Sequence, residues 1–396
     1  MSEVRGWLSR VLGAATGSTL ALALLVCGCV FAALAGPALS LHTRSEALHQ
    51  TLAGLSGTTK ALQASTDWNS FTADMALAGN GAVGLTPAML AAGTAEMSHG
   101  FTRLGVPLAP GAWAGLTSKL YAVSGVSQAA LRPGGIPEME VTYRDPLTSS
   151  TQLTAGSYAS TGAPSGAIAA VATTQTAALF GLRPGHLVTV QGSSGPVRVY
   201  VTGVVRQRAP GSTFWQQDVV AASPQLNTPA NGRPYWVGGV IADPDQLGRV
   251  ESSFSGIGLG MNWEFPLAVG NVAADQVQGL YNDLSHATTA TPALTGELLP
   301  GANSLSVTSP LLQDLSLFLA TQAAIETVLL LLFVSLMVVG AAVILLAARI
   351  IVARRETELI LLRARGGSLP QVAAVMLRTA VVAAVPATAA GVILAV

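Results

Sequence analysis

Charged residues are scarce in this 396-residue chain. Asp, Glu, Lys and Arg make up 10% of the residues, against roughly a quarter in ordinary soluble domains. Twenty basic and 20 acidic residues give a formal net charge of zero. An electrostatic nucleic-acid binder needs a basic surplus, and a disordered chain needs low hydrophobicity. The zero net charge excludes the first class, and the hydrophobic half of the residues excludes the second. The composition instead indicates a membrane protein.

Cysteine is almost absent. Cys27 and Cys29 are the only two cysteines, and both lie in the first apolar run of the sequence. Residues 42–326 therefore contain no pair of thiols that could form a disulfide. A segment of this length can bury a hydrophobic core, and its stability must come from that core.

Three long apolar runs predict helices that cross a membrane. Residues 17–41 and 327–348 are each long enough to span about 30 Å of hydrocarbon. A third run, 379–396, reaches the last residue, so we expect an incomplete third helix and the N-terminal part of a longer membrane protein. The alternative for the first run is a cleavable signal peptide, because residues 33–36 resemble a cleavage site. We favour a retained anchor, because the run is longer than the apolar core of a usual signal peptide.

Arginines set the predicted orientation in the plasma membrane. Arg5 and Arg10 precede the first run, and six arginines with only two glutamates lie in residues 349–378. Basic residues favour the cytoplasmic side, so we predict a cytoplasmic N-terminal tail, 1–16, and a cytoplasmic loop, 349–378. Residues 42–326 carry 12 basic and 17 acidic residues, a net charge of −5, and are predicted to be extracytoplasmic in a multi-pass protein.

Motifs for catalysis and metal binding are missing from the sequence. The five histidines are scattered, and neither an H-E-x-x-H motif, a Cys/His cluster nor a G-x-S-x-G motif occurs. Residues 79–84 match G-x-G-x-x-G, but no apolar strand precedes them, so they are interpreted as a loop. No G-x-x-x-x-G-K-[ST] motif occurs either. We therefore expect no enzyme activity, metal or cofactor in this chain.

The outer segment holds a few side chains that could bind or react. Aromatic residues among Pro and Gly suit either a carbohydrate or peptide groove or core packing, and we favour core packing: Trp215, Tyr235, Trp236 and Trp263. Acidic residues could form acid–base pairs, but their spacing does not support this, and solvated carboxylates are the expected outcome: Asp243, Asp245, Glu251 and Glu264.

Within residues 42–326 the patterns predict a mixed α/β domain. Residues 138–143 alternate as a strand, and residues 167–171 form a short apolar strand. A helix capped by Thr173 or Thr174 should run to Phe180 and end at Gly181 in the left-handed conformation. A hairpin should follow, with its second strand burying one face: Val197, Val199, Val201 and Val205.

Two segments next to the apolar runs are candidates for a stalk. Leucines recur every seven residues from Leu41 to Leu62, as on one face of a helix. Ser309 and Pro310 are suited to begin a second such helix, which leads into the second apolar run. The segments 42–64 and 310–326 could pair as a stalk, or each could be an amphipathic helix that packs on the domain.

The cytoplasmic loop has an unusual order of side chains. An apolar patch at 359–362 follows Arg354 and Arg355, and a Gly-Gly break separates it from a new helix with Ser368 and Gln371 in capping-box spacing. Such a patch can receive a cytoplasmic partner. Equally, the segment can lie on anionic lipid, held by its arginines.

Residues 354–368, RRETELILLRARGGS, resemble the stretch after the second membrane helix of FtsX-like (MacB-type) ABC transporter permeases. Arg365 departs from the family pattern, where an apolar residue is commoner, and Gly367 replaces a frequent alanine. Further segments resemble the large actinobacterial members, so that the resemblance covers most of the chain: 141–145, 181–190, 199–205 and 263–267.

The resemblance implies an α-helical membrane protein with a mixed α/β, MacB-like outer domain between membrane helices one and two. The implied function is that of a permease subunit that handles or exports an amphiphile such as a lipid, lipoprotein or peptide. ATP would be bound by a partner ABC ATPase, whose predicted contact is Arg354, Arg355, Glu356, Glu358, Leu359, Leu362, Arg363, Gly366 and Gly367. Further expected partners are the remainder of the permease or a second copy, and the lipid bilayer, but no nucleic acid.

A membrane-anchored extracytoplasmic sensor or binding protein is the alternative. Two spans around an external domain also describe receptor kinases. Such a receptor would need a coil and a long cytoplasmic module after Arg349, whereas only the 30 residues 349–378 separate the second apolar run from the third. The permease is therefore the favoured interpretation.

Overall fold

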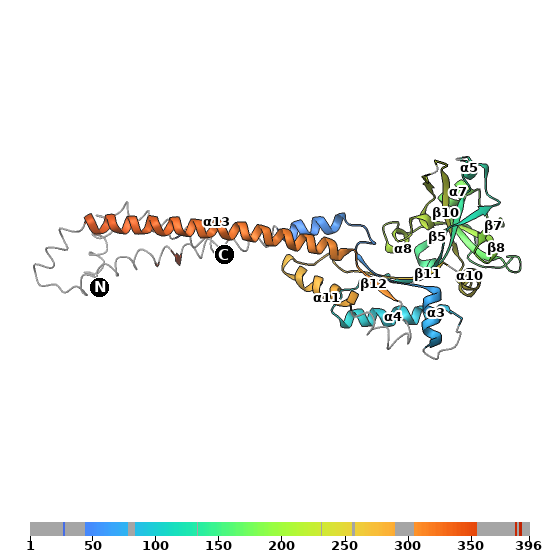
Figure 1. Cartoon of the computed structure of the whole chain (residues 1–396), viewed down its shortest axis with the longest axis horizontal. Helices are drawn as coiled ribbons and strands as arrows, with labels where there is room; N and C mark the ends of the chain where they lie inside the picture. The colour runs from blue at the N-terminus through green and yellow to red at the C-terminus, as the bar shows by residue number, and fades with distance from the viewer. Residues whose placement is uncertain are drawn as a thin grey trace, which may run out of the picture. The chain divides into compact units, whose positions relative to one another are not determined.

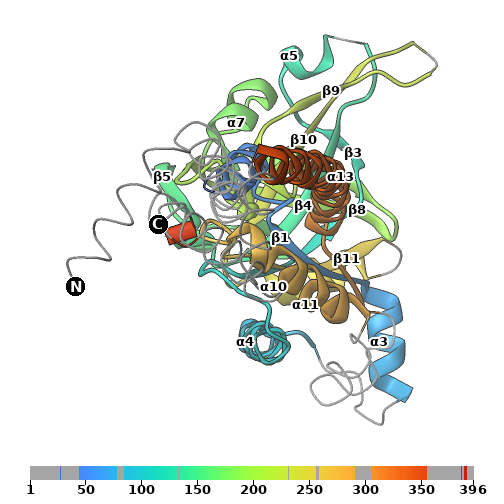
Figure 2. The ribbon, with the colours of Figure 1, turned by 90° about the vertical axis from the view of Figure 1, so that its left-hand side faces the viewer.

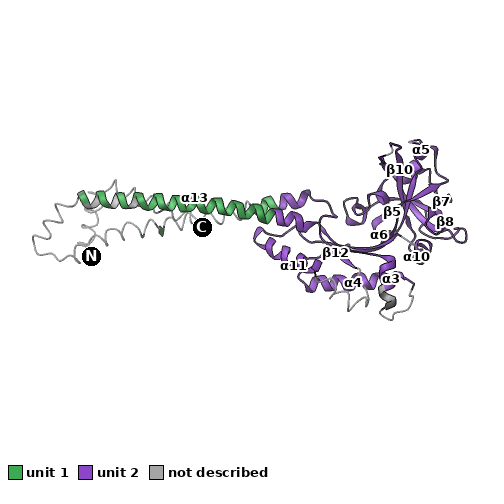
Figure 3. Ribbon diagram, in the orientation of Figure 1, with its two compact units in different colours: residues 1–48, 318–396 green, residues 49–317 purple. Residues whose placement is uncertain are grey.

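The computed structural model describes residues 27, 44–77, 84–132, 134–230, 232–255, 258–289, 305–354, 385 and 388–389. The chain divides into two compact units, which are described separately: residues 1–48 with 318–396, and residues 49–317 (Figure 3). The predicted N-terminal tail and almost all of membrane helices one and three lie outside the described residues, as does most of the loop 349–378.

Unit 49–317 contains a closed barrel of six strands. Each strand is hydrogen-bonded to the next around the ring, in the order β4 Glu138–Asp145, β3 Tyr121–Ser124, β7 Leu187–Gly192, β8 Gly195–Gln207, β6 Ile168–Thr173 and β10 Tyr235–Ala242, which returns to β4. The pairs β4–β10 and β6–β8 are parallel, and the others are antiparallel. Closure leaves no unpaired edge within the ring.

A sheet arm branches from the barrel at β4. It continues through β2 Trp113–Ser118, β11 Leu259–Pro266 and β1 Ala61–Asp67 to β12 Ser306–Thr308. In Figures 1 and 2, the helices α3 Trp68–Leu77, α4 Pro87–Arg103 and α11 Val277–Thr289 lie on one side of this arm. Because β4 pairs with β2, β3 and β10, it belongs to the barrel and to the arm at once.

Shorter elements complete the unit around the barrel. They are α5 Gln128–Leu131, α6 Leu147–Ser150, β5 Thr151–Gly156, α7 Thr174–Phe180, α8 Thr213–Gln216, α9 Val219–Ala222, β9 Gln225–Asn227, α10 Leu247–Phe254 and the 3-10 turn η1 Ala274–Gln276. β5 pairs with β8, and β9 pairs with β10. The predicted mixed α/β domain is confirmed.

The sequence signals between residues 138 and 207 are realised closely. β4, β6 and the β7–β8 hairpin cover the predicted strands. Helix α7 begins after Thr173, whose hydroxyl accepts from the Thr176 amide, and ends at Gly181 with φ 71°. Three of the four valines expected on the buried face of β8 are fully buried: Val199, Val201 and Val205.

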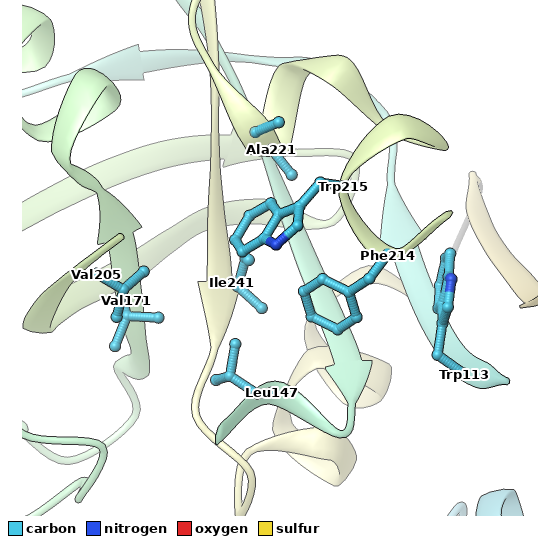
Figure 4. Close-up of a cluster of buried hydrophobic side chains, with 9 residues drawn as sticks. Trp113, Leu147, Val171, Val205, Phe214, Trp215, Ala221 and Ile241 are labelled. Carbon is cyan, nitrogen blue, oxygen red and sulfur yellow. The ribbon is translucent and has the colours of Figure 1, made fainter. Parts of the chain in front are cut away.

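A hydrophobic cluster fills the region where β10, β6 and β8 meet α8 and α9 (Figure 4). The Phe214 ring lies between the rings of the two tryptophans of the cluster. Its centre is 5.9 Å from that of Trp113 and 5.1 Å from that of Trp215, and both contacts are edge to face. Trp263 on β11 is buried as well. Core packing is therefore confirmed for Trp215 and Trp263, while Tyr235 and Trp236 are half-buried.

The leucine stripe from Leu41 to Leu62 does not lie on one helix. The described helix covers residues 44–54, a turn follows, and Leu62 belongs to strand β1. Two glycines, at 54 and 57, weaken the helix at this point, and the side chains of β1 alternate between buried and partly exposed positions. Leu48 and Leu52 are the buried leucines of the helical part.

Helix α13, Leu311–Arg354, is continuous through the second apolar run. Leu311 and Leu315 near its start are buried, whereas its later leucines are largely exposed. Within the unit made of 1–48 and 318–396, Arg44 of the helix 44–54 forms an ion pair with Glu326 of α13 at 2.6 Å. In the part of the chain that the structure describes, residues 311–343 alone form a helix long and apolar enough to cross a membrane.

Replacement of Gly181 by alanine should destabilise the full chain by about 1–2 kcal/mol, because an L-residue is strained at this φ. The new Cβ would also lie 2.9 Å from the Ser127 Cβ. Gly248→Ala is the matched control, since Gly248 lies in α10 with open space around it, and this change should stabilise by up to about 1 kcal/mol. Urea unfolding followed by tryptophan fluorescence measures both, and equal shifts in the two variants would refute the left-handed cap.

Candidate functional site

Most of the predicted ATPase-contact residues lie outside the described residues. They are Arg355, Glu356, Glu358, Leu359, Leu362, Arg363, Gly366 and Gly367. Arg354 is described as the last residue of α13. The contact thus remains a prediction. The described part holds two other features with site-like chemistry: a buried polar cluster and an open cleft.

The polar cluster is centred on β4. Six consecutive residues of this strand, 139–144, are buried, because the strand is covered on both faces. Alternation places Met139, Val141 and Tyr143 on one face and Glu140, Thr142 and Arg144 on the other. A polar face that is buried needs partners within the protein.

Arg144 supplies the positive charge of the cluster and is 2% exposed. Its Nη2 donates to Asp218 Oδ2 at 2.6 Å, and its Nη1 donates to the Phe214 carbonyl oxygen. The guanidinium carbon also lies 4.9 Å from the centre of the Trp113 ring. Asp218 in turn accepts from the Val220 and Ala221 amides at the start of α9. The pair therefore fixes the α8–α9 segment onto β4.

Two further carboxyl groups lie in this region, Glu140 and Glu264. Burial raises the pKa of Glu264 to about 8, against the lowering effects of Arg144 and the Thr213 hydroxyl. Burial, together with the nearby Asp218, raises the pKa of Glu140 to about 10. One arginine thus faces three carboxyl groups, and protonation of the two glutamates near neutral pH avoids unpaired buried charge.

Asp243 lies in a separate buried position at the end of β10. It is 0% exposed, and Thr202 on β8 donates to its Oδ1 at 3.0 Å. Burial raises the pKa of Asp243 to about 7. The expectation of solvated carboxylates is therefore wrong for Asp243 and Glu264, because strand pairing carries both into the core. Asp245 is exposed and accepts from Ser160, and the Glu251 carboxylate accepts from the Leu85 amide.

The chemistry of the cluster is structural. Arg144 and Glu264 are buried, so neither can meet a substrate without rearrangement. Among the described residues, no group of three or more His, Cys, Asp or Glu side chains could hold a metal ion. Sequence analysis did not identify this cluster. Its only local signal is the alternation of polar and apolar residues in β4, whereas Asp218 and Glu264 reach the cluster from distant parts of the chain.

The cleft lies in unit 49–317 and has a volume of about 560 Å³. Its wall is formed by the helix 44–54 and the turn after it, and by the loops that precede β2 and α8 and follow β11. The ionisable side chains of the wall are His49 and Lys60. Thr213 connects the cleft to the polar cluster, because its hydroxyl accepts from Trp113 Nε1 at 3.2 Å.

No protein-family model and no curated protein sequence matches the chain. Among solved structures, the chain is similar to a domain from Porphyromonas gingivalis that belongs to a protein with the provisional name permease. The two are 10% identical, the match covers 64% of this chain and 90% of that chain, and the TM-score is 0.24. Values this low carry neither fold nor function from one protein to the other.

Removal of the positive charge of Arg144 should lower the stability of the chain. Arg144→Met leaves Asp218 as an unpaired carboxylate and should destabilise the full chain by about 3–5 kcal/mol. Arg198→Met is the control, because Arg198 is exposed and donates to the Ser165 carbonyl oxygen. This change should alter stability by less than about 1 kcal/mol. The double variant Arg144→Met with Asp218→Asn should recover part of the loss in thermal unfolding. A double variant no more stable than Arg144→Met would contradict the ion-pair assignment.

Stability should also depend on pH through Glu264. The pKa of this group is about 8 in the folded chain, against 4.5 for an ordinary glutamate, so the folded chain retains a proton that the unfolded chain loses. The free energy of unfolding should therefore fall as pH rises from about 4.5 to about 8, by up to about 1.4 kcal/mol per pH unit. Glu264→Gln should remove this contribution in urea unfolding between pH 5 and 9.

The control for this titration is Glu96→Gln, since Glu96 is an exposed residue of α4. Its pH profile should run parallel to that of the unsubstituted chain. A profile of Glu264→Gln that also runs parallel would show that Glu264 does not retain its proton on folding.

Proposed function

We propose that this chain is the permease subunit of an ABC transporter of the FtsX/MacB type, located in the plasma membrane with unit 49–317 on the extracytoplasmic side. ATP hydrolysis by a partner ATPase would drive movement of the outer domain and so export or handle an amphiphilic substrate such as a lipid, lipoprotein or peptide. The observation that carries the proposal is the continuity of α13. This helix runs without a break from Leu311, which is buried in the outer unit, to Arg354, the first residue of the predicted ATPase contact.

The exposed surface of α13 supports a membrane position. Leu330, Leu331 and Leu332 are adjacent in sequence, so they point in different directions around the helix, and each is more than half exposed. A helix that is apolar all round is stable in lipid, whereas water would make such exposure unfavourable. Residues 311–343 are long enough for one crossing.

A continuous helix also suits mechanical coupling. Its backbone hydrogen bonds join every turn to the next, so a displacement at one end is carried along the axis instead of being absorbed in a loop. Near its start, Leu311 and Leu315 are fixed in the core of unit 49–317. In the unit made of residues 1–48 and 318–396, Glu326 of α13 forms an ion pair with Arg44. These contacts give α13 defined attachments through which a movement could act.

The energy source in this proposal is external to the chain. The sequence has no G-x-x-x-x-G-K-[ST] motif that could cradle phosphates, so ATP would be bound by the partner and no cofactor is needed here. The multi-pass arrangement, and the remainder of the permease or a second copy as further partners, belong to the same proposal. A membrane-anchored sensor is the second candidate, and the short interval 349–378 between apolar runs disfavours it.

The test is the coupling of a co-purified ABC ATPase to the full chain. Leu359→Asp together with Leu362→Asp places two charges in the apolar patch, and should lower chain-dependent ATPase stimulation by about tenfold or more, because each buried carboxylate opposes the contact. Leu226→Asp is the matched control: Leu226 is a half-exposed leucine of the edge strand β9, and this change should leave stimulation unaltered. Stimulation that survives the double substitution, with the ATPase still bound, would remove the contact assignment.

A further inference from the structure

The cleft in unit 49–317 has walls that are more apolar than polar. Leu52 of the helix 44–54, Leu267 and Val269 after β11, and Pro110 before β2 line it. Its volume of about 560 Å³ falls within the range of small-molecule sites, which is about 300–1,000 Å³. The size and the walls suit an apolar chain.

Two glycines of the cleft wall have open space beside them. Gly211 and Gly270 line the cleft, and an added Cβ at either position would meet no atom within 4 Å. Neither glycine has the left-handed φ that would itself require glycine. Nothing in the local backbone therefore demands glycine at these two positions, and a larger side chain at either of them would have open space to occupy.

The ionisable side chains that line the cleft are basic. Lys60 lines it, and among the described residues its ammonium group forms no ion pair. The other ionisable side chain is His49, whose Nε2 must carry the proton, since it donates to the Val272 carbonyl oxygen at 3.1 Å. Among the residues that the structure describes, no aspartate or glutamate lines the cleft. An acidic group would thus find a cation at this site and meet no opposing charge.

We propose that this cleft binds an amphiphile with an apolar acyl-type chain and an acidic headgroup, with the chain along Leu52 and Leu267 over the open glycines and the headgroup at Lys60. This assignment rests on the proposed function, since it names the substrate class and the place where the permease would hold it. A sugar or a polar peptide would need several directed hydrogen-bonding side chains, whereas these walls offer mainly apolar atoms.

The position of the cleft would give the bound amphiphile a role. Its wall includes the last part of the helix 44–54 and the turn that precedes β1, together with the loop after β11. The Leu267 amide donates to the Lys60 carbonyl oxygen, so these two walls are joined directly. A ligand in the cleft would contact both, and any rearrangement of the helix relative to the β1–β11 sheet would alter its site.

The experiment uses the full chain in lipid nanodiscs, without an ATPase, and a palmitic acid that carries a diazirine on its chain. After irradiation, mass spectrometry should find label in peptides that contain residues 49–60 and 266–270. Gly270→Leu fills the cleft and should lower this labelling by roughly tenfold, as expected when about two methylenes are kept out of an apolar site. Lys60→Met should lower it about threefold, the size of a single exposed ion pair.

Matched variants serve as controls. Gly248→Leu adds the same side chain at an open glycine of α10, outside the cleft, and Lys119→Met removes the only other lysine. Both should label as the unsubstituted chain does. Label confined to α13, or equal labelling of the Gly270 and Gly248 variants, would overturn the site. Equal labelling by the methyl ester of the probe would overturn the pairing of chain and acidic headgroup.

The result is separable from the test of the proposed function. Leu359→Asp with Leu362→Asp should leave the labelling unchanged, because these residues lie outside unit 49–317. If ATPase coupling is absent while the cleft is labelled as expected, the permease assignment fails and the amphiphile site stands. If coupling is present while the cleft is not labelled, the site fails alone.

Discussion

The ion pair between Arg144 and Asp218 is the interaction on which the arrangement of unit 49–317 depends. Arg144 lies on β4, the strand that the barrel and the sheet arm share. Asp218 caps α9 and, with Phe214 and Trp215 just before it, brings the α8–α9 segment against this strand. A buried guanidinium needs partners within the protein. Here the two terminal nitrogens donate to a carboxylate and a carbonyl, and two aromatic rings lie against the group. The cluster therefore joins the barrel, the arm and the covering helices at one point.

The sequence predicted those parts of the fold whose signals are local. Alternation identified β4, and the capping Thr173 with the terminal Gly181 identified α7, because the residues that form each element also mark its ends. Closure of the barrel could not be predicted in this way, since β10 pairs with β4 across about a hundred residues of sequence. The burial of Glu264 was missed for the same reason: the side chains that lower its pKa, Arg144 and Thr213, come from β4 and α8, and an isolated glutamate in a sequence is most often solvated.

The leucine stripe shows how a regular spacing can mislead. A seven-residue repeat indicates one helical face only while the helix continues, and here Gly54 and Gly57 mark the place where it stops. Leu62 keeps the repeat by position, yet it is buried in β1, where its neighbours alternate between the two faces of a sheet. The second segment behaves differently. No glycine interrupts residues 311–339, so the start of α13 and the apolar run form one helix, which joins the core of the outer unit to Arg354.

The cleft and the polar cluster share one side chain. Thr213 lines the cleft, accepts a hydrogen bond from Trp113, and its hydroxyl lowers the pKa of Glu264 against the effect of burial. Since Trp113 also stacks against the Arg144 guanidinium, a change in the position of Thr213 would reach the central charge through a single residue. A ligand in the cleft lies next to Thr213 and would restrict this threonine. Thr213 is therefore the residue through which binding in the cleft would reach the polar cluster.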